Sequence, residues 1–148
     1  MLTIRIAEKR DIEACARLLG ILFSQELEFT PDVRKQESGI EMIIGNPSAG
    51  TILVCENDGE IVAMVTLLTL VSTALGREVV LLEDMVVSPE SRNQGIGSKL
   101  VDHACDWARD HGYGRITLLT DGDNDSAHRF YSRKGFSRSQ MAVFRKML

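Results

Sequence analysis

The first third of the chain combines one strand-like and two helix-like patterns of hydrophobic residues. Residues 3–7 alternate, are rich in β-forming residues, and predict a strand. Asp11 then offers an N-cap, and apolar residues recur at helical spacing through residues 12–23. A second helix is predicted over residues 31–44, although Gly39 lies inside it and its apolar face is thin. The pattern therefore predicts a strand followed by two helices.

The middle of the chain predicts an antiparallel meander. Residues 51–56 and 60–70 have strand patterns and are joined by Asn57-Asp58-Gly59, which is a strong hairpin signal. Residues 77–87 predict a third strand with an almost continuous apolar run, which is typical of a strand buried on both faces. Two adjacent carboxylates, Glu83 and Asp84, interrupt this run, although charged side chains are unusual within a buried strand.

The second half of the chain predicts crossover units instead of hairpins. A helix is expected over residues 95–109, a short strand over 115–120, a helix from Asn124 or Asp125 to Lys134, and a terminal strand over 141–147. A meander followed by crossovers implies a mixed sheet flanked by helices, in the α/β class. Because no linker or repeat interrupts the chain, we expect residues 1–148 to form a single domain.

Composition narrows the class of protein. The 148 residues are 44% hydrophobic and 26% charged, as in ordinary globular proteins, and the formal net charge is −4. This charge favours neither a nucleic acid nor an acidic membrane as a partner. The sequence shows no secretory signal, no bilayer-spanning segment, and no disulfide or zinc spacing among its three cysteines. We therefore expect a cytoplasmic protein with its cysteines packed as small hydrophobic residues.

The clearest candidate for a ligand site is the turn Arg92-Asn93-Gln94-Gly95-Ile96-Gly97-Ser98, which joins the buried strand to a helix. A helix start presents unpaired N–H groups, and glycines let the backbone approach an anion closely. Arg92 adds a cation and Ser98 a further donor. The turn lacks the Walker A lysine, and Leu100 stands where a dinucleotide fingerprint needs its third glycine. It therefore predicts a phosphate-bearing ligand, although glycines in a turn can also serve only to supply positive φ.

Two sequence elements in a fixed order carry a family resemblance. The first is Val86-Val87-Ser88-Pro89 followed by Arg92-Asn93-Gln94-Gly95-Ile96-Gly97, and the second is Asn124 followed by Phe130-Tyr131 and Gly135-Phe136. They resemble the R/Q-x-x-G-x-G/A signature and the later helix of the GNAT superfamily of acyl-CoA-dependent N-acetyltransferases. With the matching order of elements upstream, the resemblance covers essentially the whole chain.

The resemblance implies a GNAT-like three-layer sandwich. Its mixed, mostly antiparallel sheet would have six to seven strands, about four flanking helices, and a parallel strand pair at 77–87 and 115–120 that splays apart. The pantetheine arm of acetyl-CoA would bond to backbone in that gap, and the turn amides would hold the pyrophosphate. The residues expected to bind the cosubstrate are Met85, Val86, Val87, Arg92, Asn93, Gln94, Gly95, Ile96, Gly97, Ser98, Asn124 and Tyr131.

Acetyl transfer to an amine requires one proton to be removed and another to be supplied. Deprotonating an alkylammonium at pH 7 costs about 4–5 kcal/mol. Glu83 is the preferred base because it interrupts an apolar strand, where an unpaired charge is costly. Asp84 is its rival, since neighbouring strand residues face opposite sides unless a bulge re-aims one of them. Tyr131, which matches the family's tyrosine, is expected to protonate the departing thiolate. The alternative is that these side chains only pack or form structural hydrogen bonds.

The acceptor is expected to be a primary amine of a small molecule or peptide, recognised by the two N-terminal helices and the segment between them, residues 24–38. Gln25, Glu26 and Glu28 there would suit a cation or form an ordinary polar loop. Two other functions stay open: a non-catalytic acyl-CoA sensor, and an acyltransferase for a longer acyl chain or a protein amine. No metal is expected, because the histidines lack ligand spacing. A homodimer is expected only by analogy with the family.

Overall fold

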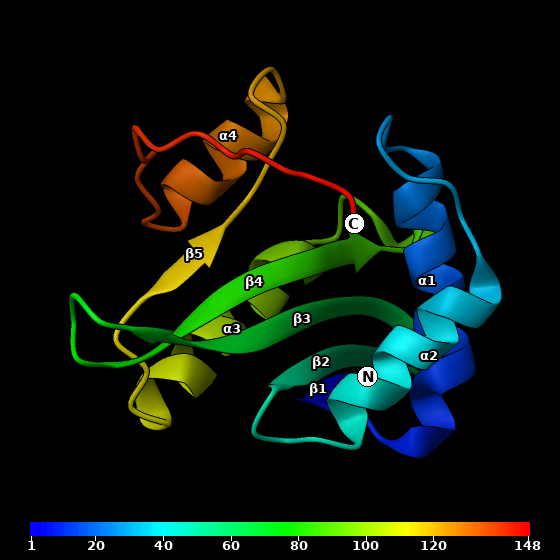
Figure 1. Ribbon diagram of the computed structural model, residues 1–148. Coiled ribbons are helices and arrows are strands. Elements are labelled where there is room, and N and C mark those ends of the chain that lie inside the picture. The colour runs from blue at the N-terminus through cyan, green and yellow to red at the C-terminus, as the bar shows by residue number, and fades with distance from the viewer.

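In the computed structural model, which describes residues 1–148, five strands form one mixed sheet in the order β1-β2-β3-β4-β5 (Figure 1). The first four strands pair antiparallel, and the last runs parallel to its neighbour. The strands are β1 (Leu2–Ile6), β2 (Gly50–Asn57), β3 (Glu60–Ser72), β4 (Arg77–Val87) and β5 (Ile116–Leu118).

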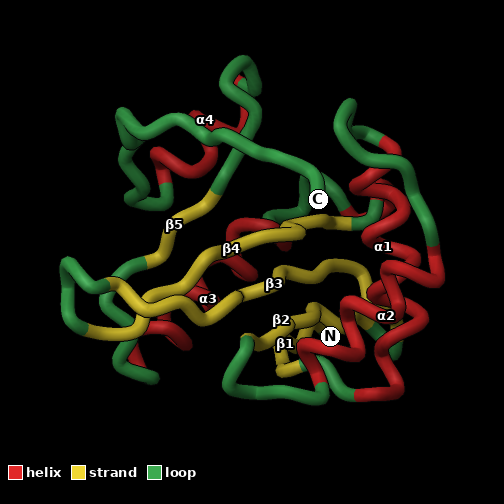
Figure 2. Tube along the Cα trace, in the orientation of Figure 1, coloured by secondary structure: helices red, strands yellow, loops and turns green.

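Four helices cover the two faces of this sheet. In Figures 1 and 2, α1 and α2 lie together on one side of the sheet, and α3 lies behind it. Two short 3-10 turns, η1 and η2, precede α1 and α3. The bounds are η1 (Lys9–Asp11), α1 (Ile12–Ser24), α2 (Val33–Ile44), η2 (Pro89–Ser91), α3 (Ile96–Asp110) and α4 (Asp125–Arg133). None of these helices is long and apolar enough to cross a bilayer.

The core consists of two hydrophobic clusters, one on each face of the sheet. Leu53 and Val65 belong to the cluster that packs on α3, whereas Val54 and Met64 belong to the cluster that packs on α1 and α2. Successive strand residues point to opposite faces, so the central strands supply both clusters by alternation. This arrangement confirms the predicted mixed sheet flanked by helices.

Two details of the predicted sheet are wrong. It has five strands rather than six to seven, and residues 141–147 form no strand. These residues begin with an apolar run, but a strand also needs a neighbouring backbone to pair with, and the last segment runs away from β5 toward α1 (red in Figure 1). Arg145 there pairs with Glu28 in the α1–α2 linker, and its guanidinium carbon lies 5.7 Å from the centre of the Phe29 ring.

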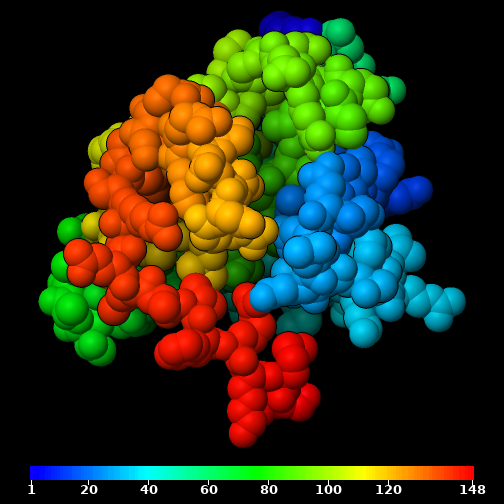
Figure 3. Space-filling model, turned by 90° about the horizontal axis from the view of Figure 1, so that it is seen from above, coloured from blue at the N-terminus to red at the C-terminus, as the bar shows by residue number.

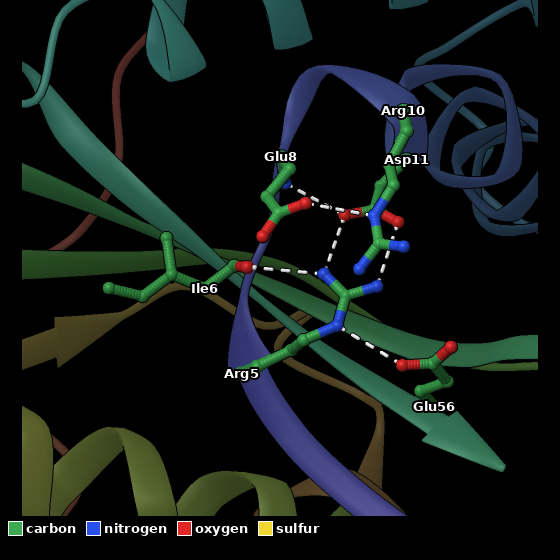
Figure 4. Close-up of polar contacts among 6 residues, drawn as sticks. All are labelled: Arg5, Ile6, Glu8, Arg10, Asp11 and Glu56. Atoms are coloured by element: carbon green, nitrogen blue, oxygen red, sulfur yellow. Dashed lines mark hydrogen bonds and ion pairs between the residues drawn. The ribbon is translucent and has the colours of Figure 1, made fainter. Parts of the chain in front are cut away.

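A cluster of charged side chains fastens the start of α1 to the sheet (Figure 4). Arg5 of β1 donates to both carboxylate oxygens of Asp11, at 2.7 and 3.0 Å, and to Glu56 of β2 at 3.1 Å. Asp11 is 4% exposed and also accepts from the backbone N–H of Glu8 at 2.7 Å. One guanidinium therefore links β1, β2 and the turn that begins the first helix.

Candidate functional site

The parallel strands β4 and β5 separate after a short contact. Their register ends at Leu82 opposite Leu118, and β5 then diverges from β4 (Figure 1). Beyond that point β4 is still paired with β3 on its other side, through Met64 with Val86 and Ala63 with Val87. The β5-facing backbone edge of Met85, Val86 and Val87 is therefore not paired with β5, and on it the carbonyl of Val87 accepts from Arg92. The expected splayed strand pair is confirmed.

The start of α3 presents a row of free backbone donors beside this edge. The N–H groups from Asn93 to Ser98 have no hydrogen-bond acceptor in the protein, and the first one bonded is that of Lys99. Asn93 and Gly95 have φ of 63° and 76°, which turns the chain sharply into the helix. Ile96 is 1% exposed, so it offers the site its N–H and not its side chain. Such a row of amides at a helix start is suited to an anion.

The two glycines of this turn serve different purposes. Gly95 needs its left-handed backbone, and a Cβ there would meet open space. Gly97 instead allows a close approach, because a Cβ there would lie 3.3 Å from the methyl carbon of Met85 and 3.6 Å from Cγ2 of Val87. Arg92 is held by a 3.1 Å hydrogen bond from Nε to the carbonyl of Val87, so its two terminal nitrogens are free to contact a ligand.

A bulge in β4 brings two adjacent carboxylates to one face of the sheet. Thr66 of β3 pairs with Glu83, but Met64 pairs with Val86, so two β4 residues, Asp84 and Met85, stand opposite one β3 residue, Val65. Asp84 lies in this bulge with φ of 53°. Leu82 and Met85 both pack on the α3 side, and the two residues between them therefore face α1 and α2.

Asp84 lines a cavity of about 280 Å³ between α1, α2 and the sheet. Burial raises the pKa of Asp84 to about 6, the neighbouring charge of Glu83 adds to this, and the Thr66 hydroxyl opposes it. None of the charges acting on Asp84 is positive. This carboxylate is thus a half-buried base on which no cation acts, and the exposed Lys35 lines the same cavity.

Acidic side chains from three segments act on one another above the sheet. Burial raises the pKa of Glu26 in the α1–α2 linker, and the charges of Asp121, Asp84, Glu28 and Glu83 raise it further. Figure 3 shows a furrow between the β5–α4 segment (yellow and orange) and α1 with its linker (blue), with β4 (green) at its floor. We call this furrow the acceptor-side groove. Its carboxylates favour a cationic ligand.

Tyr131 lies on α4, across the splayed strands from Asp84. Its ring contacts Phe130 and Phe136 at centroid distances of 5.1 and 5.7 Å, and burial raises the pKa of its phenol. Its hydroxyl donates to no group of the protein and is not among the fully buried unpaired atoms. It therefore keeps access to a ligand.

Helix α4 is fixed in place by contacts at both ends. The side-chain oxygen of Asn124 accepts from the N–H of Ala127 at 3.1 Å and caps the helix. Lys134 pairs with Asp102 of α3 at 2.9 Å. Asn124 thus uses its side-chain oxygen in folding, which leaves only its amide nitrogen free for a ligand.

The structure therefore brings the predicted residues together as two groups on opposite sides of β4. The edge of β4 and the α3 turn form one group, which α4 adjoins through Phe130, 3.9 Å from where a Cβ of Gly97 would lie, and Glu83 with Asp84 forms the other. Sequence analysis assigned the acceptor side to the two N-terminal helices and the segment between them, which supply most of the cavity lining, but it missed Thr66 and the cavity itself. The sequence signal for Thr66 was the presence of a polar residue within the buried strand 60–70. The sequence signal for the cavity was the presence of a glycine, Gly39, within a helix.

Comparisons with known proteins agree with this geometry. The profile of the acetyltransferase (GNAT) family matches residues 16–136. An uncharacterized N-acetyltransferase of Bacillus subtilis (strain 168) is 29% identical over 138 residues, covering 91% of this chain and 89% of the relative. The aminoalkylphosphonate N-acetyltransferase of Salmonella typhimurium (strain LT2) is 29% identical over 136 residues, covering 92% and 85%. The solved structure of a possible acetyltransferase from Clostridium difficile 630 has a TM-score of 0.91 over 100% of this chain and 98% of that chain, at 16% identity, and so shares the fold.

Proposed function

Because the chain belongs to the acetyltransferase (GNAT) family, we propose that it transfers the acetyl group of acetyl-CoA to a primary amine of a small molecule or peptide. The observation that carries the proposal is the edge of β4 that β5 leaves unpaired, beside the free amides of the α3 turn. The edge of β4 offers backbone groups to an extended, amide-bearing arm, and the amides of the α3 turn offer donors to a diphosphate. The similarity to an aminoalkylphosphonate N-acetyltransferase supports an amine as acceptor.

The cosubstrate would bind on the α3 side of β4. The N–H groups from Asn93 to Ser98 would donate to the diphosphate, and the free terminal nitrogens of Arg92 would contact its charge. The backbone of Met85, Val86 and Val87 would hydrogen-bond to the pantetheine amides as an added strand does. The reactive thioester would then lie where β4 and β5 separate, within reach of both faces of the sheet.

Asp84 is the base that the structure favours, with Glu83 as its neighbour and rival. A carboxylate whose pKa is about 6 is deprotonated at pH 7 and is a stronger base than an ordinary aspartate. It would first bind the acceptor ammonium and then take its proton, directly or through one water. The freed amine would attack the thioester carbonyl carbon, which forms the C–N bond.

Tyr131 would complete the proton balance. Collapse of the tetrahedral adduct breaks the carbon–sulfur bond and leaves a thiolate, which takes a proton from the tyrosine hydroxyl. Burial raises the pKa of this phenol, so it holds its proton at neutral pH until the thiolate forms. The adduct nitrogen still carries one proton more than a neutral amide, and it loses that proton as the adduct collapses, so that the tyrosinate is reprotonated by way of solvent. The proton that Asp84 accepted also returns to solvent.

The cysteines do not offer an alternative nucleophile. Burial raises the pKa of Cys15 to about 12, and burial also raises the pKa of Cys55 and of Cys105. Because a thiol attacks as its thiolate, these side chains are poorly reactive at neutral pH. This supports direct transfer between the two substrates over an acetyl-enzyme route.

A thiol-release assay tests the proposal. Acetyl-CoA with a panel of primary amines should release CoA thiol, and Tyr131→Phe should lower kcat by about tenfold or more while leaving the Kd of CoA unchanged. Tight CoA binding with no release on any amine would favour the acyl-CoA sensor instead. Faster release from propionyl- or succinyl-CoA would assign a longer acyl chain. No calorimetric heat with CoA would overturn the proposal.

A further inference from the structure

The cavity beside Asp84 has a largely apolar wall. It lies between α1, α2 and β3, and its volume is about 280 Å³. An apolar cavity of about 150 Å³ accepts benzene, so this one has room for a ring and a short alkyl chain. Its hydrophobic lining residues are Leu19, Phe23, Phe29, Ile40 and Ile43.

Several polar side chains line the same wall: Asp32 and Gln36 are engaged in hydrogen bonds, whereas Lys35 and Thr30 are exposed. The carboxylate of Asp32 accepts from the N–H groups of Arg34 and Lys35 and so caps α2. The Gln36 side chain accepts from the N–H of Asp32 at 2.7 Å and donates to the carbonyl of Ala16 at 2.9 Å. The cavity therefore combines five hydrophobic side chains with the half-buried carboxylate of Asp84, on which no cation acts, and with the exposed Lys35.

Gly39 keeps this cavity open at a cost to the helix. It lies within α2, where glycine is about 1 kcal/mol less favourable than alanine, and it lines the cavity. A Cβ atom there would meet no atom within 4 Å. No close packing and no positive φ requires this glycine, so its effect is the space that it leaves beside the cavity.

We propose that this cavity receives the apolar end of the acceptor, so that the protein selects monoamines bearing one aromatic or branched aliphatic group, with Gly39 as a specificity-determining residue. The proposal rests on the acetyl transfer proposed above. The ammonium would contact Asp84 at the cavity wall, and the hydrophobic group would fill the space between Phe23, Phe29 and Gly39.

Turnover of three amines tests the selectivity. Methylamine, 2-phenylethylamine and spermidine differ in the apolar group and in the number of charges. We expect kcat/KM for 2-phenylethylamine to exceed that for methylamine by about tenfold to hundredfold, as burial of an apolar group predicts. Equal values for the two amines, or a preference for spermidine, would overturn the cavity proposal and leave the transferase proposal intact.

A cavity-filling variant with a matched control tests the role of Gly39. Gly39→Leu should lower the ratio of kcat/KM for 2-phenylethylamine to that for methylamine by about tenfold or more. Ser38→Leu adds the same side chain at the neighbouring exposed position, and should leave that ratio as in the wild type. The melting temperature of Gly39→Leu should not fall, because a glycine is removed from a helix interior. An unchanged ratio in Gly39→Leu would refute the assignment.

Binding without acetyl-CoA separates the two proposals. 2-Phenylethylamine should raise the melting temperature of the wild type and of Ser38→Leu, and should raise that of Gly39→Leu much less. Such a shift without thiol release on any amine would support the cavity as a ligand site and overturn the transferase. If instead the protein turns over 2-phenylethylamine and Gly39→Leu does not alter that turnover, the transferase is supported and the cavity assignment is overturned.

Discussion

Glu83 and Asp84 are consecutive residues of β4, yet their carboxylates lie on the same face of the sheet. The bulge that allows this inserts one β4 residue against β3 and gives Asp84 a φ of 53°. Aspartate and asparagine tolerate that conformation better than other non-glycine residues. Burial disfavours the charged form of Asp84, and the like charge of Glu83 on the same face adds to the cost, so the pKa of Asp84 is raised to about 6. The site thus holds an electrostatically unfavourable group in place.

Replacing Asp84 by asparagine should therefore stabilise the protein while abolishing its activity. The pKa of Asp84 in the folded chain, about 6, exceeds the unfolded value of 3.8. Its favourable contribution is present below pH 3.8 and is lost as the pH rises through 6. At pH 8, Asp84→Asn should raise the free energy of unfolding by on the order of 2 kcal/mol. Urea denaturation at pH 5 and pH 8 measures this, since the gain should shrink at the lower pH.

The same variant should lose turnover. A general base contributes about 100-fold or more to the rate, and asparagine keeps the shape and tolerates the positive φ. A variant that is less stable than the wild type at pH 8, or that turns over normally, would show that Asp84 is a structural residue.

The pH dependence of kcat/KM should distinguish the two carboxylates. Asp84 as base predicts an acidic limb with an apparent pKa of about 6. The charge of Glu83 raises the pKa of Asp84, so Glu83→Gln should move that limb to lower pH without removing it. Asp84→Asn should remove it along with most of the activity. Loss of the limb in Glu83→Gln instead would make Glu83 the base.

The turn glycines should respond differently to alanine. Gly95 has φ of 76°, and an alanine there costs about 1–2 kcal/mol in the left-handed region. Gly97→Ala places a Cβ 3.3 Å from the flexible end of Met85, which can move aside. We expect Gly95→Ala to lower the free energy of unfolding by about 1 kcal/mol and Gly97→Ala to change it by less than about 0.5 kcal/mol.

A larger side chain at Gly97 completes this comparison. Gly97→Leu has no room between α3 and β4, so it should lower the melting temperature and weaken CoA binding together. Thermal denaturation and calorimetry with CoA measure both effects. Stability of Gly97→Leu equal to that of the wild type would contradict the close approach of α3 to β4.

The periodicity of the sequence predicted the elements of the fold but not every pairing. Helical spacing and hairpin signals are local, so they located α1, α3 and the β2–β3 hairpin closely. Residues 141–147 begin with an apolar run that a strand could use, but a strand's pairing partner is not encoded locally. Arg145 instead contacts Glu28 and Phe29, more than a hundred positions earlier, and such contacts cannot be found from periodicity.

The same distinction applies to the site. Arg92 and the glycine turn carry a local signal, because a helix start and positive φ depend on neighbouring residues. Glu83 and Asp84 share a face because of a bulge that the pairing of β4 with β3 produces. Alternation along the strand showed that a bulge was needed for this, but it could not show that the bulge is present. The sequence marks Gly39 only as an unfavourable residue within a helix, because the cavity that it lines is formed by residues distant in the sequence.

The charged cluster around Arg5 gives a test of stability that does not involve the groove. The guanidinium of Arg5 holds the pKa of Asp11 below its usual range, and Asp11 is 4% exposed. Arg5→Met would leave this buried carboxylate without its cation, which typically costs about 3–5 kcal/mol. Arg10→Met is the matched control, because the pair of Arg10 with Glu8 is 65% and 60% exposed and should contribute less than about 1 kcal/mol.

The pH dependence of stability should identify Asp11 as the cause. Its folded pKa lies below the unfolded 3.8, so the stability that it contributes is present above pH 3.8 and is lost as the pH falls through the folded pKa. The wild type should lose this contribution between about pH 4 and the lowered folded pKa, whereas Arg5→Met should already lack it at pH 7. Replacing both partners by apolar residues, Arg5→Met with Asp11→Leu, should restore part of the loss, since no charge then stays buried alone. If the double variant is as unstable as the sum of the single variants, the two side chains do not act as a pair and this account of the cluster is wrong.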